Sequence, residues 1–167
     1  DIITRCYSDL LTSDPIPPTS RLPFSKEEIK KVWEHQKEPW VDTVLILLYS
    51  GWRISELLNL KPEDINLQAG TMKGGTKTKA GKDRVVPIHS KIRALVEARL
   101  AEGGPRLISY NGRACSQTQY RVFWADIMKA LEMNHTPHEC RHTFETQLDS
   151  AGANRKCIDL LMGHVSK

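Results

Sequence analysis

Apolar residues recur at helical spacing through much of the chain. Ser25 and Glu28 form the pattern of a capping box, and the apolar residues within 29–33 predict a helix with one buried side. The next segment, residues 40–51 ("WVDTVLILLYSG"), is apolar on almost every side. Such a segment is typical of a helix at the centre of a domain, and we expect it to end at Gly51.

The pattern changes between residues 71 and 88 ("TMKGGTKTKAGKDRVVPI"). Thr and Lys alternate, Ala80 and Gly81 have the composition of a turn, and the apolar run "VVPI" follows. These features predict a basic β-hairpin. Before it we expect a short helix, "ELLNL", with Ser55 as its cap, and Pro62 prevents this helix from continuing.

Two more helices are predicted in the middle of the chain. One begins at Ser90 and runs to about Leu100, and the other begins after Ser116. Residues 103–112, rich in Gly, Pro and Asn, form the connector between them. The second helix has an apolar and aromatic stripe that we assign to the core: Tyr120, Phe123, Trp124, Ile127 and Leu131.

The stretch "TPHECRHTFETQ" (136–147) begins as a helix does, with Thr136 at the N-cap, Pro137 at the first position and Glu139 completing a capping box. Its apolar stripe of Cys140, Phe144 and Leu148 is predicted to be buried. The opposite face groups four polar residues at three- and four-residue spacing: His138, Arg141, His142 and Glu145. A first-turn position such as that of His138 favours bound anions.

A last short helix, "RKCIDLLM", is predicted between a cap at Asn154 and a stop at Gly163, which precedes His164. The whole pattern indicates a mainly α (α+β) fold with a small antiparallel hairpin. At 167 residues the chain has the size of one domain. We expect residues 1–24, rich in proline, to be the end of a preceding domain and a linker, and residues 25–167 to be the globular domain.

Charge adds a candidate contact surface to this picture. The net charge is only +4, but between Lys73 and Arg93 there are seven basic residues and one acidic residue. This density is expected of a surface that contacts a nucleic-acid backbone, and a solvated hairpin explains it equally well. The residues assigned to the surface are Lys73, Lys77, Lys82 and Arg84. No apolar run has the length of a membrane span or the form of a signal peptide, so we expect a cytoplasmic protein.

The four cysteines are scattered and form no CxxC pair, which argues against a zinc site and a disulfide framework. We expect them to be reduced and mostly buried. Cys140 lies on a different helix face from His138 and His142, so no metal site is predicted there.

Several basic side chains stand next to chain breaks: Arg53 after Gly51, Lys79 at the hairpin turn, His138 and Arg141 on the capped helix, and His164 after Gly163. If they converge, they form a pocket for a phosphodiester. Arginine offers paired donors to the non-bridging oxygens and stays charged as charge develops on them. A lysine can protonate a departing 5′ oxygen, and a histidine can accept a proton from an attacking hydroxyl.

Three boxes of this sequence, in order, resemble those of the tyrosine recombinases of the phage-integrase family. They are "YSGWRISELLNLKPEDIN", "TKTKAGKDRVVPI" and "TPHECRHTFETQLDSAGANRKCIDLLMGH". The resemblance implies a helical catalytic domain with a small antiparallel sheet. It also implies site-specific recombination of double-stranded DNA through a 3′-phosphotyrosine, with no metal or nucleotide cofactor, and a full-length protein that acts as a homotetramer on DNA.

By the same resemblance, Arg53 and Arg141 match the phosphate-binding arginines, and Lys79 matches the hairpin lysine, with Lys77 and Lys82 close to it. His138 matches the histidine of HxxR, and His164 the residue that hydrogen-bonds the scissile phosphate. Two further residues match supporting positions: Glu56 and His142.

The nucleophilic tyrosine of the family should follow the last box, yet no Tyr follows His164. We therefore expect a chain truncated before its nucleophile, monomeric and inactive in cleavage. Two other hypotheses remain: a type IB topoisomerase-like enzyme, which shares the chemistry, and a DNA-binding module without catalysis, which the missing tyrosine favours.

Overall fold

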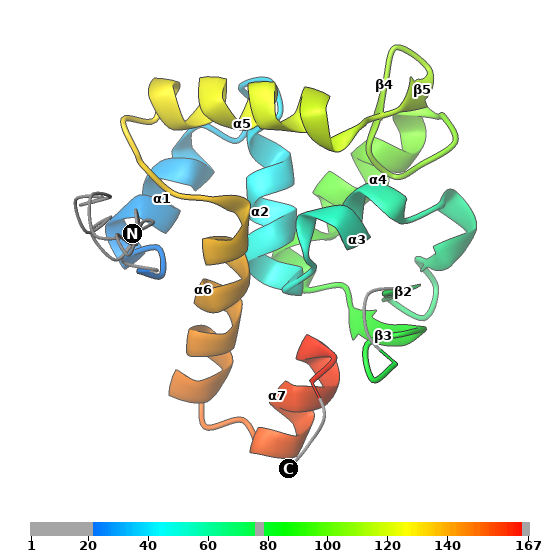
Figure 1. Ribbon diagram of the computed structural model, residues 1–167, viewed down its shortest axis with the longest axis vertical. Helices are drawn as coiled ribbons and strands as arrows, with labels where there is room; N and C mark the ends of the chain where they lie inside the picture. The colour runs from blue at the N-terminus through cyan, green and yellow to red at the C-terminus, as the bar shows by residue number, and fades with distance from the viewer. Residues whose placement is uncertain (1–21, 76–78, 165–167) are drawn as a thin grey trace, which may run out of the picture.

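Figure 1 shows the computed structural model, which describes residues 22–75 and 79–164. The α-helices of this part are α1 (Lys26–Glu34), α2 (Val41–Ser50), α3 (Ile54–Asn59), α4 (Arg93–Glu102), α5 (Gln117–Ala130), α6 (Pro137–Ser150) and α7 (Arg155–Met162). Its short elements are the 3-10 helices η2 (Pro62–Asp64) and η3 (Ser90–Ile92) and the strands β1 (Ile65–Asn66), β2 (Thr71–Gly74), β3 (Arg84–Pro87), β4 (Ser109–Tyr110) and β5 (Arg113–Ala114). The predicted mainly α fold with a small antiparallel sheet is confirmed.

Helix α2 lies at the centre of the molecule with α6 alongside it, and α5 runs across their upper ends in Figure 1. Every residue of α2 is buried except Asp42 and Tyr49, as its continuous apolar sequence predicted. The helix ends at Gly51, where a φ of 67° places the backbone in the left-handed region. The apolar stripe of α5 is also in the core, with Tyr120 and Trp124 buried.

The basic segment forms the predicted hairpin and gains a third strand. Strand β2 pairs with β3 in antiparallel register, with Met72 opposite Val86, and β1 pairs with the other edge of β2. Met72 and Val86 are fully buried and fix this small sheet to the core. Residues 76–78, with the predicted contact residue Lys77, lie outside the described residues.

The start of α3 differs from the prediction. The N-cap is Arg53, not Ser55, and the helix begins at Ile54. The reason is the side chain of Glu56, which accepts the backbone N–H of Arg53 at 3.0 Å and so satisfies a free donor of the first turn. The connector at 103–112 also differs, because it contributes to a hairpin of β4 and β5.

The first turns of α1 and α6 are joined through His135. Its Nε2 lies 3.0 Å from Glu28 of α1, and its Nδ1 lies 3.0 Å from Glu139 of α6. Both carboxylates also accept N–H groups at their own helix starts, from Ser25 and Thr136. The ring of His135 stacks on Phe24 with centroids 3.9 Å apart. The predicted caps therefore also hold the two helices together.

The predicted burial of the cysteines is confirmed in part. Cys115 and Cys140 are buried, but Cys157 is exposed on α7, and Cys6 lies outside the described residues. In the part of the chain that the structure describes, no helix combines the length and the apolar character that a membrane crossing requires.

Candidate active site

Arg53 and Glu56 form the first part of the site, at the start of α3. One oxygen of Glu56 accepts the backbone N–H of Arg53, and the other accepts its Nη1 at 3.1 Å. The side chain of Glu56 is fully buried, whereas that of Arg53 is 18% exposed. Glu56 thus fixes both the backbone and the guanidinium of Arg53, and part of the Arg53 side chain still reaches the surface.

Arg84 belongs to this group and not to the predicted DNA-contact surface. Its side chain is only 4% exposed, and its two terminal nitrogens bind the two oxygens of Glu56 at 3.0 and 2.7 Å. Its guanidinium also lies over the ring of Trp52, 4.2 Å from the centroid. Strand alternation explains the correction, since Arg84 and Val86 face inward while Val85 faces solvent. The sequence held this signal, because Arg84 stands two residues before a core valine.

Arg141 connects three helices from a buried position. It is 2% exposed. Its Nη1 donates to the carbonyl oxygen of Gly51, at the end of α2, at 2.7 Å, and its Nη2 donates to the carbonyl oxygen of Met162, at the end of α7. Helix C-termini carry partial negative charge, so a cation is stabilised there. Burial, together with Arg53 and Arg84, lowers the pKa of Arg141 to about 10, which leaves it charged at neutral pH.

His164 follows the left-handed Gly163 that ends α7. Its backbone N–H donates to the carbonyl oxygen of Asp159 at 2.8 Å, and its Nε2 lies 3.3 Å from Nη2 of Arg141. Burial and the charge of Arg141 lower the pKa of His164, so the ring is neutral at pH 7. Because arginine can only donate, Nε2 is the acceptor and the ring proton lies on Nδ1. The predicted neighbourhood of Arg141 and His164 is present in the structure.

Arg53 stands two residues after Gly51, whose carbonyl oxygen Arg141 binds, and Arg141 also contacts His164, so these three residues lie around one region. Two of the arginines share Glu56. Two further carboxylates act on Arg141 or His164, Glu145 and Asp159, and both are paired with Arg155. The two other predicted histidines lie on α6. His138 is exposed in the first turn, and its ring meets that of His142 edge-on at 4.7 Å.

The lysines of the hairpin are exposed where they are described, at positions 73, 79 and 82. The turn that contains Lys79 packs against the end of α7, because a Cβ on Gly163 would lie only 2.7 Å from Cα of Gly81. The Lys79 turn therefore adjoins the residue that precedes His164.

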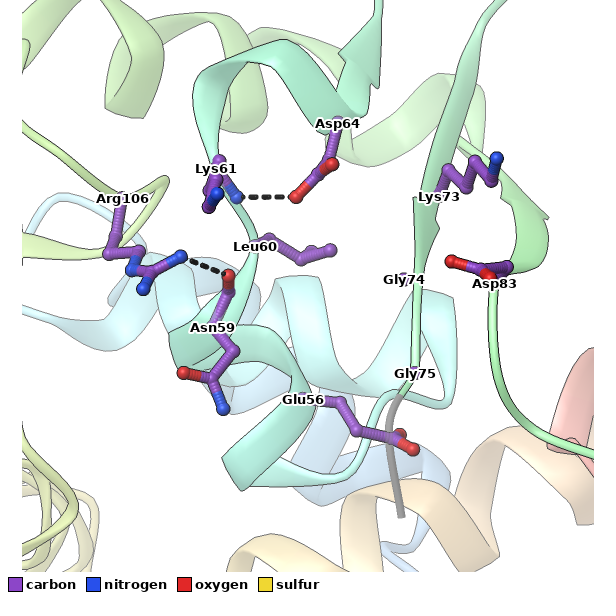
Figure 2. A pocket seen from close by; sticks show the side chains of 10 residues that line it. All are labelled: Glu56, Asn59, Leu60, Lys61, Asp64, Lys73, Gly74, Gly75, Asp83 and Arg106. Carbon is purple, nitrogen blue, oxygen red and sulfur yellow. Dashed lines mark hydrogen bonds between the residues drawn. The ribbon is translucent and has the colours of Figure 1, made fainter. Parts of the chain in front are cut away.

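A pocket of about 470 Å³ lies beside the site, between the α3–η2 segment and β2 (Figure 2). Its walls mix cations with carboxylates: Lys61, Lys73, Arg106, Asp64 and Asp83. Glu56 lies at its edge and points toward Gly75, the residue after β2. Mixed charge does not select for an anion, so the arginines and His164 are the better candidate for phosphate binding. Within residues 22–75 and 79–164, no cluster of His, Cys, Asp and Glu is placed to hold a metal ion.

The described tyrosines are engaged elsewhere. Tyr120 is fully buried and shares a 2.9 Å hydrogen bond with Thr43, and burial raises its pKa far above the ordinary value. Tyr49 accepts the Nε1–H of Trp33, and Tyr110 packs edge-on against Phe123. None of these three is placed with the arginine cluster, and Tyr7 lies outside the described residues.

Comparison with known proteins shows the family. The model of the phage integrase family matches residues 24–167, and the chain belongs to this family. It is 33% identical over 172 residues to the tyrosine recombinase XerA of Pyrococcus furiosus, which covers 95% of this chain and 59% of that protein. It is 36% identical over 132 residues to the tyrosine recombinase XerC of Pelobacter propionicus, covering 74% of this chain and 43% of that protein. The chain thus spans well under two thirds of the length of these relatives.

Solved structures show the same fold. The crystal structure of XerA recombinase superposes with a TM-score of 0.75 at 27% identity, covering 96% of this chain and 63% of that one. The Tn1549 transposon integrase, solved in complex with transposon right end DNA, gives a TM-score of 0.76 at 24% identity, covering 98% of this chain and 63% of that one. The arrangement of helices and hairpin is therefore that of a tyrosine recombinase catalytic domain.

Proposed function

We propose that this chain is the phosphate-activating part of a site-specific recombinase encoded by a phage or an integrative mobile element. The full-length protein would cut and rejoin double-stranded DNA in the cytoplasm through a 3′-phosphotyrosine, as a homotetramer on DNA and without a metal or nucleotide cofactor. The single observation that supports this most strongly is the 3.3 Å contact of Arg141 with His164 in a member of the phage integrase family, where Arg141 also binds Gly51, two residues before Arg53.

In this mechanism Arg53 and Arg141 bind the non-bridging oxygens of the scissile phosphate and stabilise the charge that develops on them. His164 donates a further hydrogen bond to the same phosphate. A tyrosine oxygen attacks phosphorus while His138 accepts the hydroxyl proton. The bond to the 5′ oxygen breaks, and Lys79 protonates that oxygen. Rejoining runs the same steps in reverse, so the phosphotyrosine conserves the bond energy.

The nucleophile in this proposal is a tyrosine encoded beyond Lys167, because none of the described tyrosines lies with the arginines. The fragment of residues 1–167 would be monomeric, would bind duplex DNA weakly and would not cleave it. Loss of the attacking group removes the covalent route altogether, whereas loss of one oxyanion donor costs about 3–4 kcal/mol of activation free energy.

The test compares residues 1–167 with the full-length protein on a nicked duplex that carries the cognate site. We expect a DNA adduct that survives denaturation only with the full-length protein. The adduct should be absent after the tyrosine beyond Lys167 is changed to Phe, and it should form more slowly after Arg53→Ala. An adduct formed by residues 1–167 would place the nucleophile within this chain and overturn the proposed arrangement. Binding without any adduct by the full-length protein would favour the DNA-binding module.

A further inference from the structure

Arg84 makes the shortest contact with the carboxylate of Glu56, yet it is too deeply buried to be part of a contact surface for DNA. Both terminal nitrogens are used on Glu56, at 3.0 and 2.7 Å, and the flat face of the guanidinium covers Trp52. Two parallel N–H···O bonds fix the plane of the carboxylate as well as its position. Arg84 therefore sets the orientation of Glu56.

The orientation of Glu56 in turn determines that of Arg53. The oxygen that accepts Nη1 of Arg53 also accepts Nη1 of Arg84, and the oxygen that accepts the Arg53 backbone N–H also accepts Nη2 of Arg84. Each oxygen of Glu56 is thus shared between the two arginines. Without Arg84, the fully buried carboxylate of Glu56 loses two of its four hydrogen bonds. It must then rotate or bind water, and either change moves the Arg53 side chain.

Arg84 also contacts the neighbouring parts of the site. Its Nη1 lies 3.5 Å from the carbonyl oxygen of Gly81, in the turn after Lys79. A Cβ built on Gly163 would lie 3.2 Å from the same nitrogen, so the residue before His164 packs directly against it. One buried guanidinium thus touches α3, the hairpin turn and the end of α7.

From these contacts we propose that Arg84 is a positioning residue for DNA cleavage, which acts through Glu56 to hold Arg53 in its phosphate-binding geometry. This inference rests on the proposed function, because it assumes that Arg53 binds the scissile phosphate. Arg84 itself does not touch the DNA. Its loss should therefore reduce the rate of cleavage and leave the affinity for DNA almost unchanged.

The experiment uses the full-length protein with Arg84→Met and Arg84→Lys, and measures adduct formation on a nicked duplex at saturating DNA together with the dissociation constant of the complex. We expect cleavage to slow by about 10- to 100-fold, less than the roughly 10²- to 10³-fold typical of losing a direct oxyanion donor. Arg84→Lys should not restore the rate, because an ammonium cannot bind both oxygens of Glu56 in one plane. The dissociation constant should change by less than about threefold, because no phosphate contact is lost.

A second substrate separates positioning from a general loss of folding. A methylphosphonate at the scissile position replaces one charged non-bridging oxygen by a methyl group, so it needs less stabilisation by Arg53. The defect of Arg84→Met relative to the unchanged protein should shrink by about tenfold on this substrate. A misfolded protein would be equally defective on both substrates, and an equal defect would overturn the proposal. Thermal unfolding of each variant is measured in parallel, and Arg121→Met, at an exposed position on α5, is the matched control.

The variant Arg53→Lys separates the positioning role of Arg84 from the proposed function. If Arg53→Lys slows cleavage but Arg84→Met does not, the positioning role is wrong and the proposed function stands. If Arg53→Lys has no effect, the proposed function itself fails. In the double variant, Arg84→Met should slow cleavage little further once Arg53 is changed. Such non-additive losses of rate would show that the two residues act through the same interaction.

Discussion

At the scale of single residues, the arginines of the candidate site depend on one carboxylate, that of Glu56. Burial opposes the charge of Glu56, but the hydrogen bonds from Arg84 and Arg53 outweigh this effect and lower its pKa below the ordinary value. The charged form is therefore the one that the fold stabilises. Removing one partner of a buried ion pair generally costs more than the pair contributes, because the remaining charge keeps its desolvation penalty.

We predict that Glu56→Gln lowers the free energy of unfolding at pH 7 by about 3–5 kcal/mol, the cost of leaving a buried charge without its partner. The pKa of Glu56 is lower in the folded state, so its stabilisation is complete above the unfolded-state pKa and is lost as the pH falls through the folded-state pKa. The variant should therefore lose stability less steeply than the unchanged chain when the pH falls below about 4.5.

Urea unfolding at several pH values tests this. Glu97→Gln is the control, because Glu97 forms an exposed pair with Arg93 at 2.9 Å on α4. Its effect should stay below about 1 kcal/mol, as for other surface ion pairs. Equal effects of the two substitutions would contradict the central role of Glu56.

At the scale of elements, the end of α7 and the hairpin turn are built to touch. Gly163 has a φ of 64°, and a Cβ at this position would collide with the backbone of Gly81. Gly152, after α6, has a similar φ of 76° but open space around its Cα. Substitution of Gly152 therefore measures the free-energy cost of the left-handed backbone alone, whereas substitution of Gly163 adds the cost of the contact with the hairpin turn.

We predict that Gly152→Ala costs about 1 kcal/mol of stability through the left-handed backbone alone, and that Gly163→Ala costs at least about 1 kcal/mol more because the hairpin turn must also move. Thermal unfolding gives the comparison. In the full-length protein Gly163→Ala should also slow cleavage, since His164 is the next residue. Equal destabilisation by both substitutions would show that the hairpin yields freely at this contact.

At the scale of the whole molecule, the exposed lysines of the hairpin are expected to meet the DNA backbone. We predict that Lys73→Gln weakens binding to every duplex sequence and lowers the magnitude of the slope of log K against log salt by about 1, the loss of one phosphate contact. Fluorescence anisotropy at several salt concentrations measures the slope. Lys30→Gln, at an exposed position on α1, should leave it unchanged, and a slope that stays the same for Lys73→Gln would remove this lysine from the interface.

Features with local causes could be predicted from the sequence. The caps at Ser25, Thr136 and Asn154 set the starts of three helices within a few residues, and the apolar run of α2 made its central place evident. Features that depend on distant partners could not. Strands β1 and β4 have two residues each and exist only through their pairing, and the burial of Arg84 depends on Glu56 and Trp52, 28 residues or more away in sequence.

The candidate site follows the same division. The sequence placed Arg53, Arg141 and His164 at the ends of elements, but not how Arg141 would use its donors. In the structure, the two terminal nitrogens of Arg141 donate to the carbonyl oxygens of Gly51 and Met162. These contacts form only once α2, α6 and α7 are packed. Side-chain function at such junctions is set by tertiary packing, which a linear pattern does not encode.

The bridge at His135 couples α6 to the segment that leads into α1. The backbone N–H of Phe24 donates to Thr143 of α6 at 2.8 Å, and its ring rests on His135, which is fixed to both helix starts. A force on the backbone before Phe24 is therefore transmitted to α6 as well as to α1. Since Arg141 lies on the buried face of α6, a force on the segment before Phe24 would shift Arg141, the residue that we propose binds the scissile phosphate.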